Sequence, residues 1–297
     1  MTPALAGLRY LAVSVLLFGG LWPVTKHAFA HATPLWFALN RAGLAALVSA
    51  TLLAALGRLR LPRRADLPAV VAIGLLQLGG FFALTHLALD FVPAGRTAIL
   101  SNVTVFWLVP LSVLALGERV SPRQWAAAAV GLLGVLALMA PWGAWGGAGD
   151  AGGGAQPGLL AGYALLLGAS FAWSVAILVT RRSPPQRPVL ELLPWCFGLG
   201  ALMILPLALL REPAGGIGRE AWPHAAFVGA VAAPIGTWAT IEAGRRLSGV
   251  VASLGFLAIP AFGVALSSLW LGEPLGWDVL LGSALILGSV AVAARGA

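Results

Sequence analysis

Ten apolar segments, each long enough to cross a lipid bilayer, follow one another along this chain of 297 residues. A membrane-spanning helix needs roughly 20 apolar residues, and its backbone polar groups must pair within the helix because lipid offers no partners. The segments lie at about 8–30, 34–56, 68–89, 93–115, 121–140, 158–180, 189–210, 222–245, 248–271 and 275–294. They predict an all-α polytopic membrane protein with ten transmembrane helices and almost no water-soluble part.

Composition supports this prediction. Hydrophobic residues make up 60% of the chain, charged residues make up 9%, and the mean hydropathy is +0.93. A soluble domain of this size carries far more charge. The net charge of +8 would suit a nucleic-acid partner only if the basic residues formed one patch with interleaved aromatic residues, and they do not. We therefore expect contact with membrane lipid and none with nucleic acid.

The basic residues follow the connections between the segments. With a cytoplasmic N-terminus, most of the 18 Lys and Arg residues fall on the cytoplasmic side. Only Arg96, Arg211 and Arg219 fall on the outer side, while Lys26 and Arg41 lie within segments. The distribution predicts that both termini are cytoplasmic.

Two other features of the chain need an interpretation. The first segment resembles a cleavable signal peptide, but its loss would leave an odd set of nine helices, so we interpret it as a retained helix. The lone Cys196 cannot form an intrachain disulfide.

A repeated motif divides the chain. Leu114–Glu118 reads LALGE, and Leu269–Glu273 reads LWLGE, 155 positions later. A short match between Leu- and Gly-rich stretches carries little weight alone, but the flanking residues agree in the same register. The flanking matches are Ala94 with Gly249, Gly74 with Gly229, and Thr85 with Thr240.

The repeat predicts a domain organisation. We expect a first five-helix unit at 1–140, a Gly-rich outer linker at 141–157 and a second five-helix unit at 158–297. Because five is an odd number, the second unit must enter the membrane in the opposite sense. The chain is therefore expected to form two inverted repeats.

Two cations lie inside predicted membrane helices, where charge is expensive. Lys26 shares one helix face with Trp22, and it either lines a cavity or extends to the lipid headgroups. Arg41 follows Asn40 about two turns below the outer surface, so it should face protein or water. Its alternative role is an ion pair with Asp90.

Other polar side chains are less decisive. Gln77 and His86 lie nine positions apart on opposite faces, so they share one cavity only if the intervening glycines bend the helix. His86 could titrate near neutral pH, but we favour the commoner role, a hydrogen bond between helices. Asn102 is the main polar candidate of the fourth segment. Glu242 either pairs with Arg245 three positions on or contributes to proton coupling.

A family resemblance emerges from the segment FVPAGRTAILSNVTVFWLVPLSVLALGERVSPRQW (Phe91–Trp125) and its echo LGEPL from Leu271. These stretches resemble the EamA repeat of the drug/metabolite transporter superfamily, and the resemblance covers nearly the whole chain. It implies a ten-helix bacterial inner-membrane carrier with inverted repeats and cytoplasmic termini, of a kind that often exports amino acids or related metabolites. One departure is Val105, where the family usually has a proline, as at Pro260. Pro110 therefore predicts a deeper kink in the fourth segment.

Functions other than transport find little support. No metal-ligand cluster, nucleophile with a base, or phosphate-binding loop is recognisable, so we expect no cofactor or metal, and an intramembrane enzyme is a disfavoured alternative. No ring of like charges or filter-like sequence indicates a channel. The sequence is best interpreted as a carrier that works by alternating access and is not an enzyme.

The aromatic and cationic residues indicate the cargo. Aromatic walls beside positive charge suit an amphipathic small molecule, whose carboxylate would bind the cations. We expect export of amino acids, including apolar and aromatic ones, with broad drug or metabolite efflux as the alternative; the sequence leaves the oligomeric state open. Candidate cavity residues are Trp22, Lys26, Asn40, Arg41, Gln77, Phe81, His86, Asn102, Trp107, Trp173 and Trp238, with His86 and Glu242 for coupling and Glu118 and Glu273 as repeat-turn or gating residues.

Overall fold

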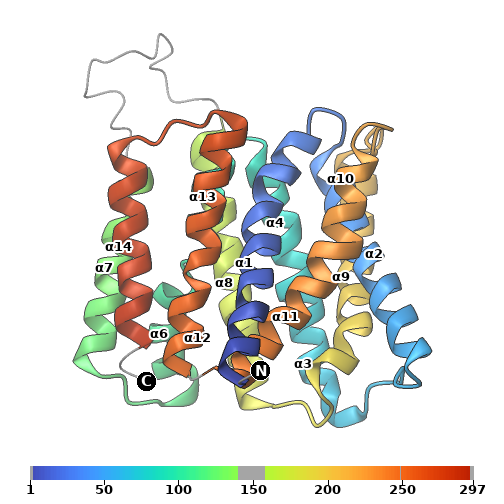
Figure 1. The fold of residues 1–297 in the computed structure, drawn as a ribbon, viewed down its shortest axis with the longest axis horizontal. Helices are drawn as coiled ribbons and strands as arrows, with labels where there is room; N and C mark the ends of the chain where they lie inside the picture. Colours follow the sequence, from blue (N-terminus) through green and yellow to red (C-terminus); the bar gives the residue numbers. More distant parts are fainter. Residues whose placement is uncertain (1–2, 140–157, 248, 295–297) are drawn as a thin grey trace.

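The computed structural model describes residues 3–139, 158–247 and 249–294, which are mostly helical (Figure 1). The predicted linker 141–157 lies outside the described residues. The first half contains α1 (Pro3–Ala28), α2 (Pro34–Ala55), η1 (Arg64–Asp66), α3 (Leu67–Val71), η2 (Ala72–Gly80), α4 (Phe81–Leu89), α5 (Ala94–Leu100), α6 (Thr104–Leu116) and α7 (Pro122–Met139). The second half contains α8 (Leu159–Arg182), α9 (Val189–Arg211), α10 (Trp222–Ala226), η4 (Phe227–Ala232), α11 (Ala233–Arg246), α12 (Gly249–Phe256), α13 (Ala258–Leu271) and α14 (Trp277–Ala294).

Seven helical runs among the described residues are long and apolar enough to cross a membrane. Two of them, Arg64–Leu89 and Trp222–Arg246, contain the π-helical segments η2 and η4. Three further apolar helices are shorter, at Phe106–Leu116, Ala258–Leu271 and Trp277–Ser289. The predicted all-α membrane class is confirmed, whereas the count of ten spans stays a prediction.

The fourth and ninth predicted segments are each interrupted at the same point of the repeat. At 101–103, Asn102 Nδ2 donates to Ala98 O at 2.7 Å and so competes for the carbonyl that a continuing helix would use. The second interruption is at Leu257, three residues before Pro260, whose nitrogen cannot donate a hydrogen bond. Pro110, where a kink was predicted, lies inside α6, so the interruption comes earlier in the fourth segment than predicted.

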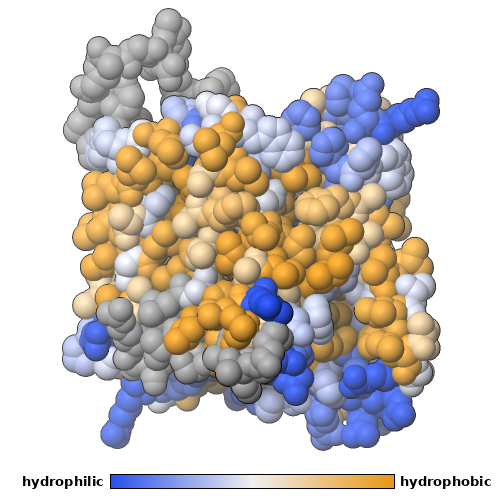
Figure 2. All heavy atoms as spheres, viewed as in Figure 1, coloured by the Kyte–Doolittle hydropathy of each residue, from blue (hydrophilic) through white to orange (hydrophobic). Residues whose placement is uncertain are grey.

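The long helices run in alternating directions between two faces of the bundle (Figure 1). The beginning of α1 and the end of α14 lie at the same face, which we call the N-terminal face. A broad apolar band crosses the visible side of the molecule, and hydrophilic residues gather along its lower edge and at the upper right (Figure 2). The apolar band is the surface that a membrane protein presents to lipid.

Residues 155 positions apart make equivalent contacts. A Cβ added at Gly74, in η2, would lie 3.0 Å from Leu199 Cβ of α9. A Cβ added at Gly229, in η4, would lie 2.9 Å from Leu44 Cβ of α2. Leu44 precedes Leu199 by the same offset that separates the two glycines. The sequence repeat is therefore also a repeat of helix packing.

The pair formed by α7 and α14 follows the same rule. A Cβ at Gly131 would lie 2.8 Å from Ser289 Oγ, and one at Gly134 would lie 2.8 Å from Ile286 Cγ1. Position 131 corresponds to 286 in the repeat, and position 134 corresponds to 289. The contact of Gly131 with Ser289 is therefore equivalent to the contact of Gly134 with Ile286. Small residues let these helices approach closely, as is usual where lipid gives no hydrophobic driving force.

Carboxylates tie the two halves together at both faces. On the face opposite the N-terminal face, Glu212 accepts a hydrogen bond from Leu35 N at 3.0 Å, which caps α2 from the end of α9. On the N-terminal face, Asp66 is fully buried and accepts hydrogen bonds from Gln186 N at 2.7 Å and Arg187 N at 3.1 Å. The α2–α9 side of the bundle is thus fastened at its two ends.

Candidate functional site

Arg41 is a buried cation with no counter-ion among the residues that the structure describes. It lies on α2, is 5% exposed, and places Cζ 3.8 Å from the centroid of the Phe82 ring on α4. Its Nε and Nη1 atoms are buried without a hydrogen-bond partner. Burying a charge is costly unless a partner compensates it, and a cation–π contact supplies only about 2 kcal/mol. Two of the three guanidinium nitrogens, Nε and Nη1, therefore still lack an acceptor.

The alternative ion pair between Arg41 and Asp90 does not form between these described residues. Asp90 follows α4 and lies near Lys26 instead. Burial raises the pKa of Asp90 above its usual value, opposed by Lys26 and assisted by Glu212. Lys26 Nζ donates to the backbone oxygen of Leu89, so this lysine points to the end of α4 and not to the headgroups.

His86 is fully buried beside the same aromatic ring. Its Nδ1 lies 2.7 Å from Phe82 O, and its Nε2 has no partner. Asn40, next to Arg41, likewise has a buried Oδ1 without a partner. We call the three residues in mutual contact around the Phe82 ring the Arg41 cluster: Arg41, Phe82 and His86. The cluster joins α2 to α4 and contains unpaired polar atoms of both donor and acceptor type.

Aromatic rings continue from the Arg41 cluster towards α6 and α8. The Phe82 ring lies 6.4 Å from that of Phe81, which meets Trp173 edge-on at 4.8 Å. Trp107 Nε1 donates to Ser170 Oγ at 2.9 Å. The predicted candidates Phe81 and Trp173 are therefore linked to Arg41 through the Phe82 ring. Trp107 lies on α6 and contacts α8, the helix that contains Trp173. Phe82 was not among the predicted candidates, although it follows Phe81 directly.

The remaining cavity candidates lie elsewhere. Trp22 is buried and faces α13, because a Cβ at Gly263 would lie 3.4 Å from its Cδ1. Gln77 lies half-buried within η2, where wider π-helical turns alter the rotation that separates it from His86. Asn102 is exposed at the interruption between α5 and α6.

Trp238 and Glu242 belong to a separate group on α11. Trp238 is 41% exposed and meets the Tyr10 ring edge-on at 5.0 Å. Glu242 is buried and pairs with Arg245 Nη1 at 3.1 Å, as one prediction held, and also with Arg246. Two cations thus neutralise this carboxylate.

The repeat-turn glutamates lie on opposite faces. Glu118 follows α6 at the N-terminal face and contacts Arg181 Nη2 at 2.7 Å. Glu273 follows α13 at the opposite face, where its carboxylate accepts hydrogen bonds from Ala94 N at 2.6 Å and Gly95 N at 2.8 Å. Their partners hold them away from the Arg41 cluster.

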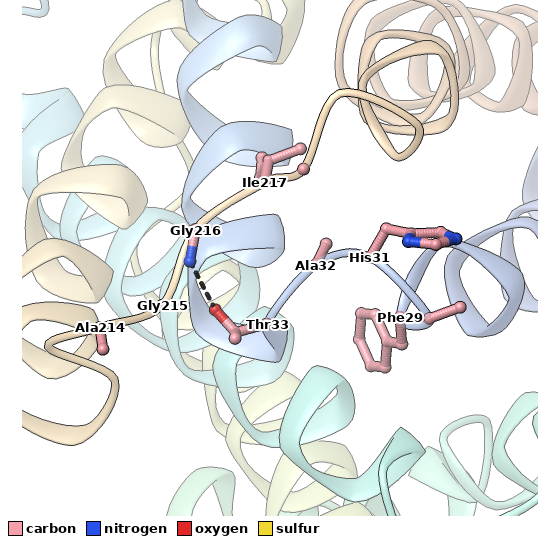
Figure 3. A pocket seen from close by; sticks show the side chains of 10 residues that line it. Phe29, His31, Ala32, Thr33, Ala214, Gly215, Gly216 and Ile217 are labelled. Atoms are coloured by element: carbon pink, nitrogen blue, oxygen red, sulfur yellow. Dashed lines mark hydrogen bonds between the residues drawn. The ribbon is translucent and has the colours of Figure 1, made fainter.

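A surface hollow of about 480 Å³ opens on the face opposite the N-terminal face (Figure 3). It lies between the α1–α2 and α9–α10 connections, which are joined by hydrogen bonds from Thr33 N to Gly216 O and from Gly216 N to Thr33 Oγ1. Phe29 lines the hollow, and its ring also lies 6.2 Å from that of His86. The hollow offers little chemistry of its own, but the Phe29 side chain connects it to the Arg41 cluster.

Both halves of the chain match a known family. Residues 5–140 and 160–295 each correspond to the EamA-like transporter family. The chain belongs to this family. As an EamA-like transporter it is a multi-pass membrane protein that acts on small molecules.

Relatives of this EamA-like transporter agree over almost their whole length. The uncharacterized transporter YdeK of Bacillus subtilis (strain 168) is 27% identical over 290 residues, covering 95% of each chain. A probable amino-acid metabolite efflux pump of Salmonella typhimurium is 27% identical over 293 residues, covering 94% of this chain and 91% of that one. A probable terminal-alkyne amino-acid exporter of Streptantibioticus cattleyicolor is 25% identical over 292 residues, covering 94% and 90%.

A solved structure shares the fold of this EamA-like transporter. The crystal structure of a protein with 20% sequence identity superposes with a TM-score of 0.65, covering 98% of this chain and 97% of that one.

Proposed function

We propose that this EamA-like transporter is a secondary carrier that exports amino acids, including apolar and aromatic ones, across the bacterial inner membrane. The observation that carries the proposal is Arg41, a buried guanidinium whose Nε and Nη1 lack an acceptor and which lies against the Phe82 ring. An α-carboxylate supplies two acceptor oxygens in the geometry that a guanidinium binds best. The Phe82 and Phe81 rings supply an apolar surface for the side chain.

The names of two relatives agree with this substrate class. One is described as a probable amino-acid metabolite efflux pump and another as a probable terminal-alkyne amino-acid exporter. At 25–27% identity these names are compatible with several related substrates. The charge of Arg41 favours the carboxylate-bearing ones.

Alternating access of two inverted repeats is the mechanism we propose. Ten spans in two five-helix units, at 1–140 and 158–297 on either side of the linker 141–157, would place the N-terminal face and both termini in the cytoplasm. Support comes from the contacts of Gly74 and Gly229, which reappear at one constant offset, and from interruptions at the same point of each repeat. Two halves related in this way can exchange conformations and open the path to either face in turn.

Counterflow in liposomes tests the substrate class. Vesicles loaded with unlabelled leucine are expected to accumulate labelled leucine, and external phenylalanine should compete. Leucinamide has the same side chain and amino group but no carboxylate, so it should compete at least about tenfold more weakly, as expected for loss of a charge-assisted hydrogen bond. Equal competition by leucinamide would contradict recognition of the carboxylate by Arg41.

The same vesicles separate the proposed function from broad drug efflux. Absence of counterflow with every amino acid in a full panel, together with resistance of expressing cells to cationic toxins, would favour a drug or metabolite efflux carrier. The described part of the membrane region offers such cations little attraction, since Glu242 is already paired with two arginines.

Proton coupling is expected to be weak, or to depend on His86 or Glu242. His86 is buried within α4, and Glu242 is buried within α11, where Arg245 and Arg246 hold it. A pH gradient imposed on loaded vesicles should therefore drive little accumulation in the variant with both His86→Ala and Glu242→Gln. Steep accumulation driven by pH alone, undiminished in this double variant, would show a coupling site elsewhere.

A further inference from the structure

Glu273 fastens two helices of different repeats together. It follows Gly272, whose φ of +68° ends α13 in the left-handed conformation that glycine adopts without strain. Its two carboxylate oxygens accept one hydrogen bond each from the backbone N–H groups of Ala94 and Gly95, at the start of α5. These N–H groups have no partner inside their own helix, and they carry its positive end. One side chain therefore holds α13 against α5.

The contact between α5 and α13 is close along its length. A Cβ at Gly95 would lie 3.5 Å from Val264 Cα, and one at Gly263 would lie 3.0 Å from Ala98 Cβ. Ser267 is fully buried in the same contact, 3.7 Å from the Gly95 Cβ position, and its hydroxyl has no hydrogen-bond partner. The bundle is closed here, at the face opposite the N-terminal face.

Glu118 occupies the equivalent place at the N-terminal face, but its carboxylate has a different partner. It follows Gly117, whose φ of +65° matches that of Gly272. It accepts a hydrogen bond from Arg181 Nη2 at 2.7 Å, and the two side chains remain 39% and 48% exposed. Among the described residues, α6 and α12 make no contact comparable to that of α5 with α13. The two equivalent sites thus differ among the described residues. Glu273 caps α5, which packs against α13, whereas Glu118 pairs with Arg181 and α6 lies apart from α12.

We propose that Glu118 and Glu273 cap helices alternately during transport. When the N-terminal face closes, Glu118 leaves Arg181 and accepts the backbone N–H groups of Gly249 and Val250 at the start of α12. These residues follow Ala94 and Gly95 by the repeat offset of 155. Glu273 releases α5 as the opposite face opens. The inference rests on the inverted repeat and alternating access proposed above, and it gives each state a closing contact of its own.

Energy differences favour the cap over the ion pair as the decisive contact. An ion pair as exposed as Glu118–Arg181 contributes little, because water and salt screen it. A carboxylate that accepts two helix N–H groups makes charge-assisted hydrogen bonds, which are stronger. Exchange of one such cap for its equivalent leaves the two states similar in free energy, as a carrier that must visit both requires.

Labelling of a cysteine at position 267 reports opening of the face opposite the N-terminal face without any substrate. Serine and cysteine are nearly isosteric, and Ser267 Oγ has no hydrogen bond to lose, so Ser267→Cys should fold normally in a Cys196→Ala background. A membrane-impermeant maleimide applied to right-side-out vesicles should react slowly. Adding Glu273→Gln should accelerate labelling about tenfold, because the closed contact loses its cap. Glu220→Gln, an exposed carboxylate on the same face, is the matched control and should leave the rate unchanged.

The role of Glu118 is tested in the Glu273→Gln protein, where labelling is fast. Adding Glu118→Gln should slow it several-fold, because the alternate state then loses its own cap. Gly249→Pro should do the same, since proline is tolerated in the first helical turn but has no N–H to donate. It also leaves Glu118 and Arg181 untouched, so it serves if Glu118→Gln folds poorly.

Three outcomes would overturn the alternate caps. The first is a labelling rate that Glu273→Gln leaves unchanged. The second is a rate that neither Glu118→Gln nor Gly249→Pro slows in the Glu273→Gln protein. The third is an Arg181→Gln variant that slows labelling as Glu118→Gln does, which would assign the effect to the ion pair. Labelling needs no transported solute, so a wrong substrate class leaves this result intact, and failed counterflow with intact labelling shifts identifies an error in the substrate alone.

Discussion

Arg41→Met is expected to abolish most amino-acid counterflow while raising the thermal stability of the purified protein. A charge-assisted hydrogen bond contributes roughly 1.5–3 kcal/mol, so loss of the carboxylate partner should reduce transport about 10- to 150-fold. The stability should change in the opposite direction, because the buried guanidinium has unpaired atoms and a methionine fills the same space without a charge to desolvate. Counterflow in liposomes and melting in detergent measure the two effects on one preparation.

Two further variants make the Arg41 result specific. Arg219→Met removes an exposed arginine from the face opposite the N-terminal face, where the hollow opens, and should leave both measurements unchanged. Arg41→Lys keeps the charge but loses the planar, two-pronged donor, so transport should fall between the wild type and Arg41→Met. A methionine variant that melts at lower temperature and still exchanges amino acids would show that Arg41 holds α2 against α4 and binds no substrate.

The helices were predictable because span length and apolar content are properties of the sequence itself. Their interruptions were harder to place. The break at 101–103 depends on a side-chain hydrogen bond from Asn102 to Ala98 O, and nothing in the apolar pattern distinguishes this asparagine from a cavity residue. Pro110 gave a stronger local signal, yet it lies within a continuous helix. The position of the interruption therefore depends on local hydrogen bonding, which amino-acid composition does not reveal.

In the candidate site, the sequence predicted which residues are unusual but not which partners they contact. The sequence identified Arg41 and His86 as costly residues in a membrane, which depends only on their chemistry. It paired Arg41 with Asp90 as an alternative because it had no means of knowing which helix faces α2. The structure places Phe82 under the guanidinium and directs Lys26 to Leu89 O beside Asp90. Partners across a helix interface follow from packing, which one sequence alone does not reveal.

Gly200→Ala is expected to destabilise the protein, whereas Gly198→Ala, two residues earlier on α9, is expected to stabilise it. A Cβ at Gly200 would lie 3.0 Å from Gly79 N and 3.1 Å from Gly74 O, both backbone atoms of η2. Backbone cannot rotate away as a side-chain end can, so the helices must separate, at a cost of about 1–3 kcal/mol. A Cβ at Gly198 meets nothing within 4 Å, so alanine there should gain about 0.5–1 kcal/mol of helix stability.

If Gly200→Ala lowers the stability and Gly198→Ala raises it, the α9–η2 contact is part of the rigid scaffold of the carrier. The α9–η2 contact lies on the side of the bundle that Glu212 and Asp66 fasten at both faces, so it should stay closed in every state. Gly200→Ala should therefore lower the melting temperature in detergent without changing the labelling rate of Ser267→Cys in the protein that remains folded. A change in labelling with unchanged melting would mean that α9 and η2 separate during transport. In that case the fixed scaffold would have to be sought elsewhere, in the α7–α14 pair.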